Sequence, residues 1–195
     1  MLAQTVLTIF QGFQLPVQSL LTKTMILTSD KIHEEVLENK ITIVPYDAKY
    51  LNPNSYNFHL GETLYVYTNN VIDPKVEQPI KEIKIPDSGF LLEPGELYLG
   101  HTKEVMGSNH YVPLIFGRSS IGRLGLFIQI TAPLGDIGFT GCWTLQLTSV
   151  LPTKIYKDLR IGQIFFIMPY GDITLYNGKY QNSVQARKSE IFRDF

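Results

Sequence analysis

Residues 138–150, GFTGCWTLQLTSV, combine a glycine-bounded turn with a segment in which apolar and polar side chains alternate. Trp143 and Leu145 belong to the apolar set, and Thr144 and Gln146 to the polar set. Alternation with a period of two is typical of a β-strand, because successive side chains point to opposite faces of the sheet. The stretch therefore predicts a strand that carries its apolar and polar sets on opposite faces.

Similar short runs, separated by turn residues, follow one another along most of the chain and predict further strands. They cover residues 41–46, 63–68, 80–86, 89–102, 125–131, 142–148, 160–169 and 173–178. The 15 Gly and 11 Pro of the chain are consistent with many turns and little helix. We therefore predict a mostly β fold of the sandwich or barrel type, with no internal repeat.

One short helix is predicted before these strands. Thr28, Ser29 and Asp30 are candidate N-terminal caps. Ile32, Val36 and Leu37 then form an apolar face at helical spacing, and the helix is predicted to end near Asn39 and Lys40. The helix and the strands together make a single domain of residues 25–195, since 195 residues with 44% hydrophobic content can bury one full core.

The amino-terminal residues 1–24 form an extension, and whether they belong to the domain is left open. They are apolar but begin without Lys or Arg, and Gln, Gly and Pro interrupt them. These features make a poor signal peptide and a poor membrane span. We expect no membrane partner.

Charge and cysteine content exclude several classes of function. The 17 basic and 18 acidic residues give a net charge of −1, with no basic run that could follow a nucleic-acid backbone, so no nucleic-acid polymer is expected as a partner. Cys142 is the single cysteine, which excludes an internal disulfide and fits a reducing compartment. We expect a cytoplasmic protein in which Cys142 is a small buried side chain.

Common catalytic motifs are absent from the sequence. Zinc-dependent base deaminases carry His-x-Glu followed by Pro-Cys-x-x-Cys, and neither half occurs here, so no zinc cofactor is predicted. There is also no P-loop, no Gly-x-Ser-x-Gly elbow and no dinucleotide fingerprint. The four histidines, His33, His59, His101 and His110, are not spaced as metal ligands.

A candidate anion site lies in residues 116–147. Arg118 and Arg123 bracket two hydroxyl side chains, Ser119 and Ser120, in a glycine-punctuated turn. One guanidinium group can donate hydrogen bonds to two phosphate oxygens at once, and hydroxyl groups add neutral donors. This turn can therefore hold a triphosphate. The same turn can also be a loop in which the arginines pair with carboxylates, and the residues alone leave both interpretations open.

Several motifs, in their order and spacing, resemble the dCTP deaminase family, a branch of the trimeric dUTPase superfamily that includes bifunctional dCTP deaminase-dUTPases. They are PNSYNFHLG, LLEPGELYLGHTKE, GRSSIGRLGL, TAPLGDIGFTGCWTLQL, LRIGQIFF and GKYQ. The resemblance implies a distorted jelly-roll β fold and a homotrimer with active sites at subunit interfaces. It also implies a dUTP or dCTP substrate, with Mg²⁺ bound through the nucleotide and not by side chains.

The resemblance assigns roles in the Gly-Arg-Ser-Ser turn. Arg118, Ser119 and Ser120 match residues that hold the phosphates, and Ser119 also lies near the reacting centre. Arg123 matches an arginine that helps to order the catalytic water.

The resemblance also assigns roles to residues in the second half of the chain. Ala132 and Asp136 match the segment around base and sugar, and Asp136 also matches the aspartate of the third dUTPase motif. Phe139 stands where dUTPases present an aromatic side chain to the nucleotide. Lys179 and Tyr180 match a carboxy-terminal tail that closes over the triphosphate.

The sequence departs from the family pattern at four places. Gln146 stands where the family has the glutamate that shuttles protons in deamination. Asn57 replaces an aspartate, Leu134 and Gly135 replace Trp-Ile, and Ser183 replaces a glutamine.

The substitution at Gln146 favours hydrolysis over deamination. Deamination needs a group that takes and returns a proton, and an amide cannot titrate near neutral pH. Hydrolysis of dUTP to dUMP and pyrophosphate needs a carboxylate to activate water, and Asp136 can fill that role. A dCTP deaminase that forms dUTP, or dUMP if bifunctional, is the first alternative. A catalytically silent nucleotide-binding homologue is the second.

Overall fold

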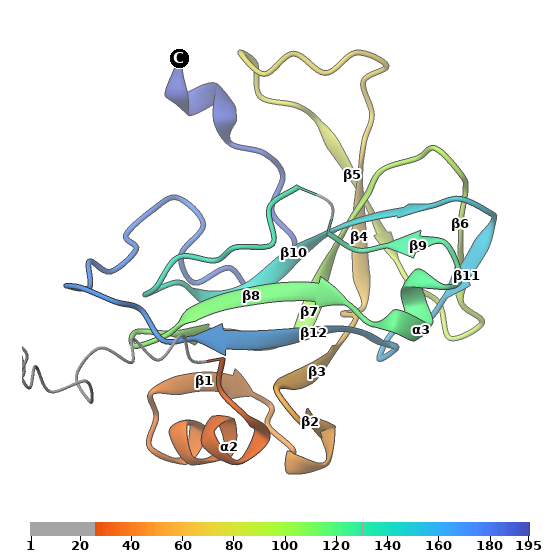
Figure 1. Ribbon diagram of the computed structural model, residues 1–195. Helices are drawn as coiled ribbons and strands as arrows, with labels where there is room; N and C mark the ends of the chain where they lie inside the picture. Colours follow the sequence, from red (N-terminus) through yellow and green to blue (C-terminus); the bar gives the residue numbers. More distant parts are fainter. Residues whose placement is uncertain (1–25, 130) are drawn as a thin grey trace, which may run out of the picture.

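Two antiparallel β-sheets share one hydrophobic core in the computed structural model, which describes residues 26–129 and 131–195 (Figure 1). The predicted extension, residues 1–24, lies outside the described residues, so its boundary with the domain stays a prediction. No helix in the described part is long and apolar enough to cross a membrane.

The first sheet has six strands and is built around β7 (Tyr98–Ser108). Its order is β5 (Ile80–Lys84), β4 (Thr63–Tyr67), β7, β10 (Thr140–Ser149) and β9 (Leu126–Phe127), and β1 (Ile41–Val44) pairs with the end of β7. The register between β10 and β7 shifts between Cys142 and Thr144, and Gln146 then lies opposite Leu99.

The second sheet has four strands, in the order β2 (Leu51–Asn52), β3 (Ser55–His59), β12 (Arg160–Ile167) and β8 (Val112–Gly117). A separate pair joins β6 (Phe90–Leu92) to β11 (Thr153–Ile155). The helical elements are α2 (Ser29–Leu37), the short α3 (Ser119–Gly122), and the single turns η3 (Ala48–Tyr50) and η4 (Ile191–Asp194).

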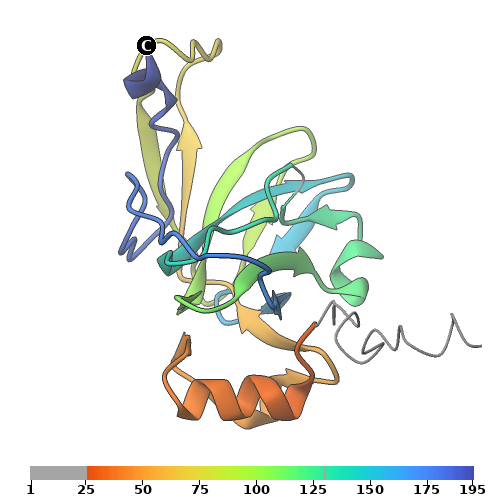
Figure 2. The same ribbon diagram turned by 60° about the vertical axis from the view of Figure 1, so that its left-hand side comes forward.

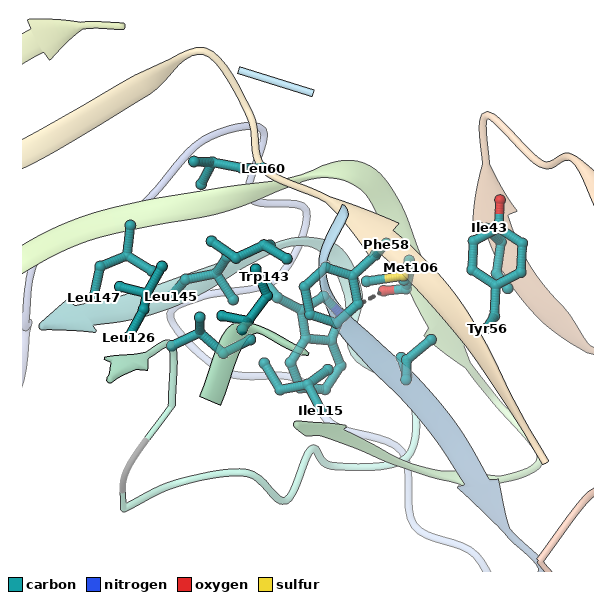
Figure 3. Packing of buried hydrophobic residues seen from close by; sticks show 14 of the residues in the cluster. Ile43, Tyr56, Phe58, Leu60, Met106, Ile115, Leu126, Trp143, Leu145 and Leu147 are labelled. Carbon is teal, nitrogen blue, oxygen red and sulfur yellow. Dashed lines mark hydrogen bonds between the residues drawn. The ribbon is translucent and has the colours of Figure 1, made fainter. Parts of the chain in front are cut away.

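The core contains side chains from both sheets, as Figure 3 shows. Phe58 of β3 and Ile115 of β8 are fully buried, as are Leu145 and Leu147 of β10. Trp143 is also buried, and its indole nitrogen donates to the carbonyl of Met106 at 3.0 Å. The predicted alternation in β10 is therefore confirmed, because its apolar set faces the core while Thr144 and Gln146 are only partly buried.

Helix α2 packs against β1 of the first sheet and β3 of the second, and it matches the predicted helix except at its carboxyl end. It ends at Leu37, and Asn39 has a positive φ of 58°, which stops the helix. Leu37 is exposed, and the buried face instead includes Ile32 and Glu35. The Glu35 carboxylate is accommodated there because it pairs with Lys31 at 2.6 Å.

Candidate active site

A pocket of about 610 Å³ lies beside β10, and we call it the β10 pocket. Its lining includes five of the residues that the sequence singled out: Ala132, Asp136, Phe139, Gln146 and Tyr180. A volume of this size is typical of sites for nucleotide-sized ligands. The structure thus brings Ala132 and Asp136, predicted to surround base and sugar, together with Tyr180 of the predicted tail.

Strand β10 places Gln146 in this pocket through its alternation. Leu145 and Leu147 point into the core, so Gln146 points away from it, on the same face as Thr144. The backbone N–H of Gln146 donates to the carbonyl of Ile128 at 2.9 Å, which fixes the strand at this point. No hydrogen bond among the described residues uses the Gln146 side chain, so its amide can meet a ligand.

The turn after Asp136 is held by the carboxy-terminal segment. Gly138 takes a φ of 98°, a conformation that favours glycine, and its N–H donates to the carbonyl of Ser108 at 2.7 Å. The Gln181 side chain donates to the Gly138 carbonyl at 2.7 Å and accepts from the N–H of Thr140 at 2.9 Å. Gln181 therefore fixes the turn that carries Asp136, a role that the sequence analysis missed.

Three aromatic rings support the wall of the pocket. Phe139 packs edge to face against Trp143, with ring centroids 5.1 Å apart, and against Tyr176 at 6.0 Å. All three side chains line the pocket. Phe139 is half-buried, so one part of its ring is fixed by its neighbours and another part faces the cavity.

Gly135, one of the departures from the family pattern, lies directly against the ring of Trp143. A Cβ atom added at Gly135 would lie 2.0 Å from Cη2 of the Trp143 ring. The indole occupies the space that a larger side chain at this position needs. Gly135 and Trp143 therefore fit each other in this chain.

We expect Gly135→Ala to lower the free energy of unfolding by about 1–3 kcal/mol, because overpacking forces the indole out of place. Trp143 is the single tryptophan of the chain, so its fluorescence emission should shift in the same variant. Gly122→Ala is the control, since a Cβ atom there meets nothing within 4 Å. Native emission and unchanged stability of Gly135→Ala would contradict the fit described here.

The predicted phosphate-holding residues lie in a second pocket of about 300 Å³, which we call the α3 pocket. Its lining includes Arg118, Ser119, Ser120 and Arg123, at and around the first turn of α3. Among the described residues, neither arginine forms an ion pair, and the Arg118 guanidinium donates only to the carbonyl of Arg160, at 3.3 Å. The arginines are therefore not paired with carboxylates within the described part of the chain, and their role in holding an anion stays a prediction.

Asn57 lines the α3 pocket and is 4% exposed. Its side-chain nitrogen donates to the carbonyl of Tyr50 at 3.1 Å and to the Asn52 side chain at 3.0 Å. No acidic residue is among the described residues that line this pocket. The asparagine therefore leaves Arg118 and Arg123 free of a competing negative charge there.

The two pockets share no lining residue within the chain. Lys179 lies in neither, because its ammonium group is held by Asp194 at 2.9 Å and by the carbonyl of Glu190 at 3.0 Å. Its neighbour Tyr180 does reach the β10 pocket. One chain thus separates the phosphate-holding residues predicted in the Gly-Arg-Ser-Ser turn from those predicted to surround the base and sugar.

Cys142, which lines the β10 pocket, and the buried histidines His59 and His101 are the remaining reactive side chains. Burial raises the pKa of the Cys142 thiol, which keeps it protonated near neutral pH. His59 lies 2.6 Å from Glu104 in the interior, and burial lowers the pKa of His101. No group of three or more His, Cys, Asp or Glu side chains in the described ranges could hold a metal ion.

Comparison with known proteins identifies the family of the chain. Residues 26–168 match the profile of the dCTP deaminase-like family. The chain belongs to the dCTP deaminase-like family. It is thus a member of a family of nucleotide-metabolising hydrolases, and the resemblance stated from the sequence motifs is confirmed.

Two relatives illustrate the likeness within the dCTP deaminase-like family. A protein of Clostridium beijerinckii named "dCTP deaminase, dUMP-forming" is 49% identical over 172 residues, which are 88% of this chain and 99% of the relative. A protein of Leptospira biflexa with the same name is 47% identical, over 88% of this chain and 98% of the relative.

A solved structure supports the fold. The 2'-deoxycytidine 5'-triphosphate deaminase of Agrobacterium tumefaciens superimposes with a TM-score of 0.61 at 21% sequence identity. The match covers 75% of this chain but only 49% of that chain. The predicted fold class, a mostly β dUTPase-type fold with a short N-terminal helix, is confirmed.

Proposed function

We propose that the protein hydrolyses dUTP to dUMP and pyrophosphate. One observation carries the proposal: Asp136 is the single carboxylate among the described residues that line the β10 pocket, and Gln146 supplies an amide in the same pocket. A carboxylate can activate water, whereas an amide can hydrogen-bond a base edge but cannot exchange protons near neutral pH. This pair of groups suits hydrolysis of a phosphoanhydride better than deamination.

The chemistry follows from these positions. Asp136 orients a water molecule and takes its proton as the water oxygen attacks the α-phosphorus. The bond between that phosphorus and the bridging oxygen of the β-phosphate then breaks, and pyrophosphate leaves. Arg118, Ser119 and Ser120 hold the phosphates, and Arg123 helps to order the water. The substrate is a magnesium–dUTP complex, in which the ion is held by phosphate oxygens and neutralises part of their charge.

A second candidate is deamination of dCTP with dUMP as the product. The names of the relatives from Clostridium beijerinckii and Leptospira biflexa favour it, since both read "dCTP deaminase, dUMP-forming". It requires a proton-exchanging group in place of the family glutamate, and Asp136 is the first residue to consider. Both candidates share dUMP as a product.

A single assay separates the candidates. The purified protein is incubated with dUTP or with dCTP, and nucleotides, pyrophosphate and ammonia are measured. We expect dUMP and pyrophosphate from dUTP, and neither ammonia nor dUMP from dCTP. Formation of dUMP and ammonia from dCTP would establish the second candidate. Binding of both nucleotides without any product would identify a silent nucleotide-binding protein.

We also expect a homotrimer with active sites between subunits. The β10 pocket of one subunit would meet the α3 pocket of a neighbour, which would explain why a single chain keeps Asp136 and Arg118 in separate pockets. Sedimentation should therefore give about three times the 22.2 kDa of one chain. A 22.2 kDa species that turns over nucleotide would contradict this arrangement.

A further inference from the structure

The carboxy-terminal segment, residues 183–195, lies along β10 and along the β4–β5 hairpin (Figure 2). Hydroxyl groups of the sheet hold it in place: Tyr65 donates to the Gln185 side chain at 2.7 Å, and Tyr67 accepts from the N–H of Ser189 at 3.0 Å. Lys188 pairs with Glu77 of the hairpin at 2.6 Å. The segment is thus fixed at several points and forms one wall of the β10 pocket.

Arg187 is the cation that this segment places beside Gln146. The N–H of Arg187 donates to the Thr144 hydroxyl at 2.8 Å. Thr144 and Gln146 share one face of β10 and are two residues apart, which is about 7 Å along a strand. Arg187 also lines the β10 pocket together with Asp136 and Gln146.

Glu190 fixes the guanidinium group of Arg187. The Glu190 side chain is 6% exposed, and it accepts a hydrogen bond from Nη2 of Arg187. Its second oxygen lies 2.8 Å from Arg193, and its backbone N–H donates to the Tyr180 hydroxyl at 3.0 Å. The hydrogen bond from Arg187 and the charge of Arg193 lower the pKa of the Glu190 carboxyl, so it stays ionised at neutral pH.

We propose that Arg187 contacts the phosphates of a nucleotide in the β10 pocket and that Glu190 is its positioning residue. The inference rests on the proposed function in one respect, the choice of a nucleoside triphosphate as ligand. Glu190 uses one of the five N–H donors of Arg187, which leaves the others free for phosphate oxygens. Because backbone and guanidinium are both held in advance, little side-chain entropy is lost when the ligand binds.

Neighbouring cations are less suited to this contact. Lys188 lines the same pocket, but its ammonium group is paired with Glu77. Arg193 shares Glu190 with Arg187, yet it is not among the residues that line the pocket. Arg193 therefore provides a matched control, since its loss also removes one cation from Glu190.

The test measures binding of two ligands by calorimetry: inorganic tripolyphosphate, and a dUTP analogue with a nitrogen bridge between the α- and β-phosphorus atoms. We expect Arg187→Gln to raise the dissociation constant of both about 10- to 100-fold, because a charge-assisted contact is lost. Arg193→Gln should change either constant by no more than about twofold. Glu190→Gln should give an intermediate increase, and Arg187→Lys should recover part of the affinity.

Thermal melting of each variant checks that the fold is retained. If the ion pair of Arg187 and Glu190 had only a structural role, its loss would not change the affinity for tripolyphosphate. Equal affinities of Arg187→Gln and Arg193→Gln for tripolyphosphate would overturn the inference. Wild-type protein that binds tripolyphosphate through Arg187 but leaves dUTP intact would overturn the proposed hydrolysis alone. The two failures are therefore distinguishable.

Discussion

Replacement of Asp136 by asparagine is expected to lower kcat for dUTP hydrolysis by about 10²- to 10⁴-fold, with little change in KM. Asparagine keeps the size and hydrogen-bonding capacity of the side chain but cannot take a proton from water. Because Asp136 is the single carboxylate among the described lining residues of the β10 pocket, no neighbour there can substitute for it. Release of pyrophosphate measures the effect.

Asp172→Asn is the matched control for this variant. Asp172 lies with Asp136 in a neighbouring groove of about 490 Å³ but does not line the β10 pocket. Its replacement removes a similar charge from the same region and should leave kcat within about twofold. An Asp136→Asn protein that is folded and hydrolyses dUTP at the wild-type rate would show that another group activates the water.

The strands that could be predicted from the sequence are of two kinds. In one, apolar and polar side chains alternate; in the other, a short continuous apolar run lies between two turns. In β10 the period of two placed Leu145 and Leu147 in the core and Gln146 on the opposite face, and this prediction is confirmed. Strand β8, VPLIFG, contains Pro113 and was not predicted. That proline is tolerated because β8 is an edge strand of its sheet.

The strand predicted at residues 173–178 is wrong. This segment has no regular pairing in the structure, and its N–H at Tyr176 donates to the carbonyl of Ile137 at 2.7 Å. Ile173 and Leu175 are 42% and 49% exposed, so the apolar residues of the segment do not form a buried strand face. Local composition could not distinguish this loop from a strand, because the segment is ordered by contact with the turn after Asp136.

In the candidate site, too, contacts between residues close in sequence could be predicted, and contacts between distant residues could not. The Gly-Arg-Ser-Ser turn could be predicted as an anion site because its donors are adjacent in sequence. The contact between Arg187 and Thr144 spans 43 residues, and that between Gln181 and Gly138 also spans 43. No local pattern near Arg187 or Gln181 signals these contacts, since the tertiary fold alone brings the segments together.

The largest expected gain of activity follows from the replacement of Gln146 by glutamate. The wild-type protein should release no ammonia from dCTP above background, whereas Gln146→Glu should release a measurable amount. The two side chains are nearly the same size, and β10 would hold the new carboxylate at the position of the amide. A carboxylate there can accept a proton from water and return one to the leaving ammonia, which is the step that an amide cannot perform.

Gln129→Glu is the control for charge alone, since Gln129 lines the same pocket and its replacement adds the same carboxylate at another point. Ammonia release by Gln146→Glu and not by Gln129→Glu would show that position, and not charge, decides deamination. The Gln146→Glu variant should hydrolyse dUTP no faster than wild type, because a second carboxylate in the pocket of Asp136 repels the phosphates. Wild-type protein that deaminates dCTP at the rate of an ordinary enzyme would refute this account, and Asp136 would then be the first candidate for the proton-exchanging group.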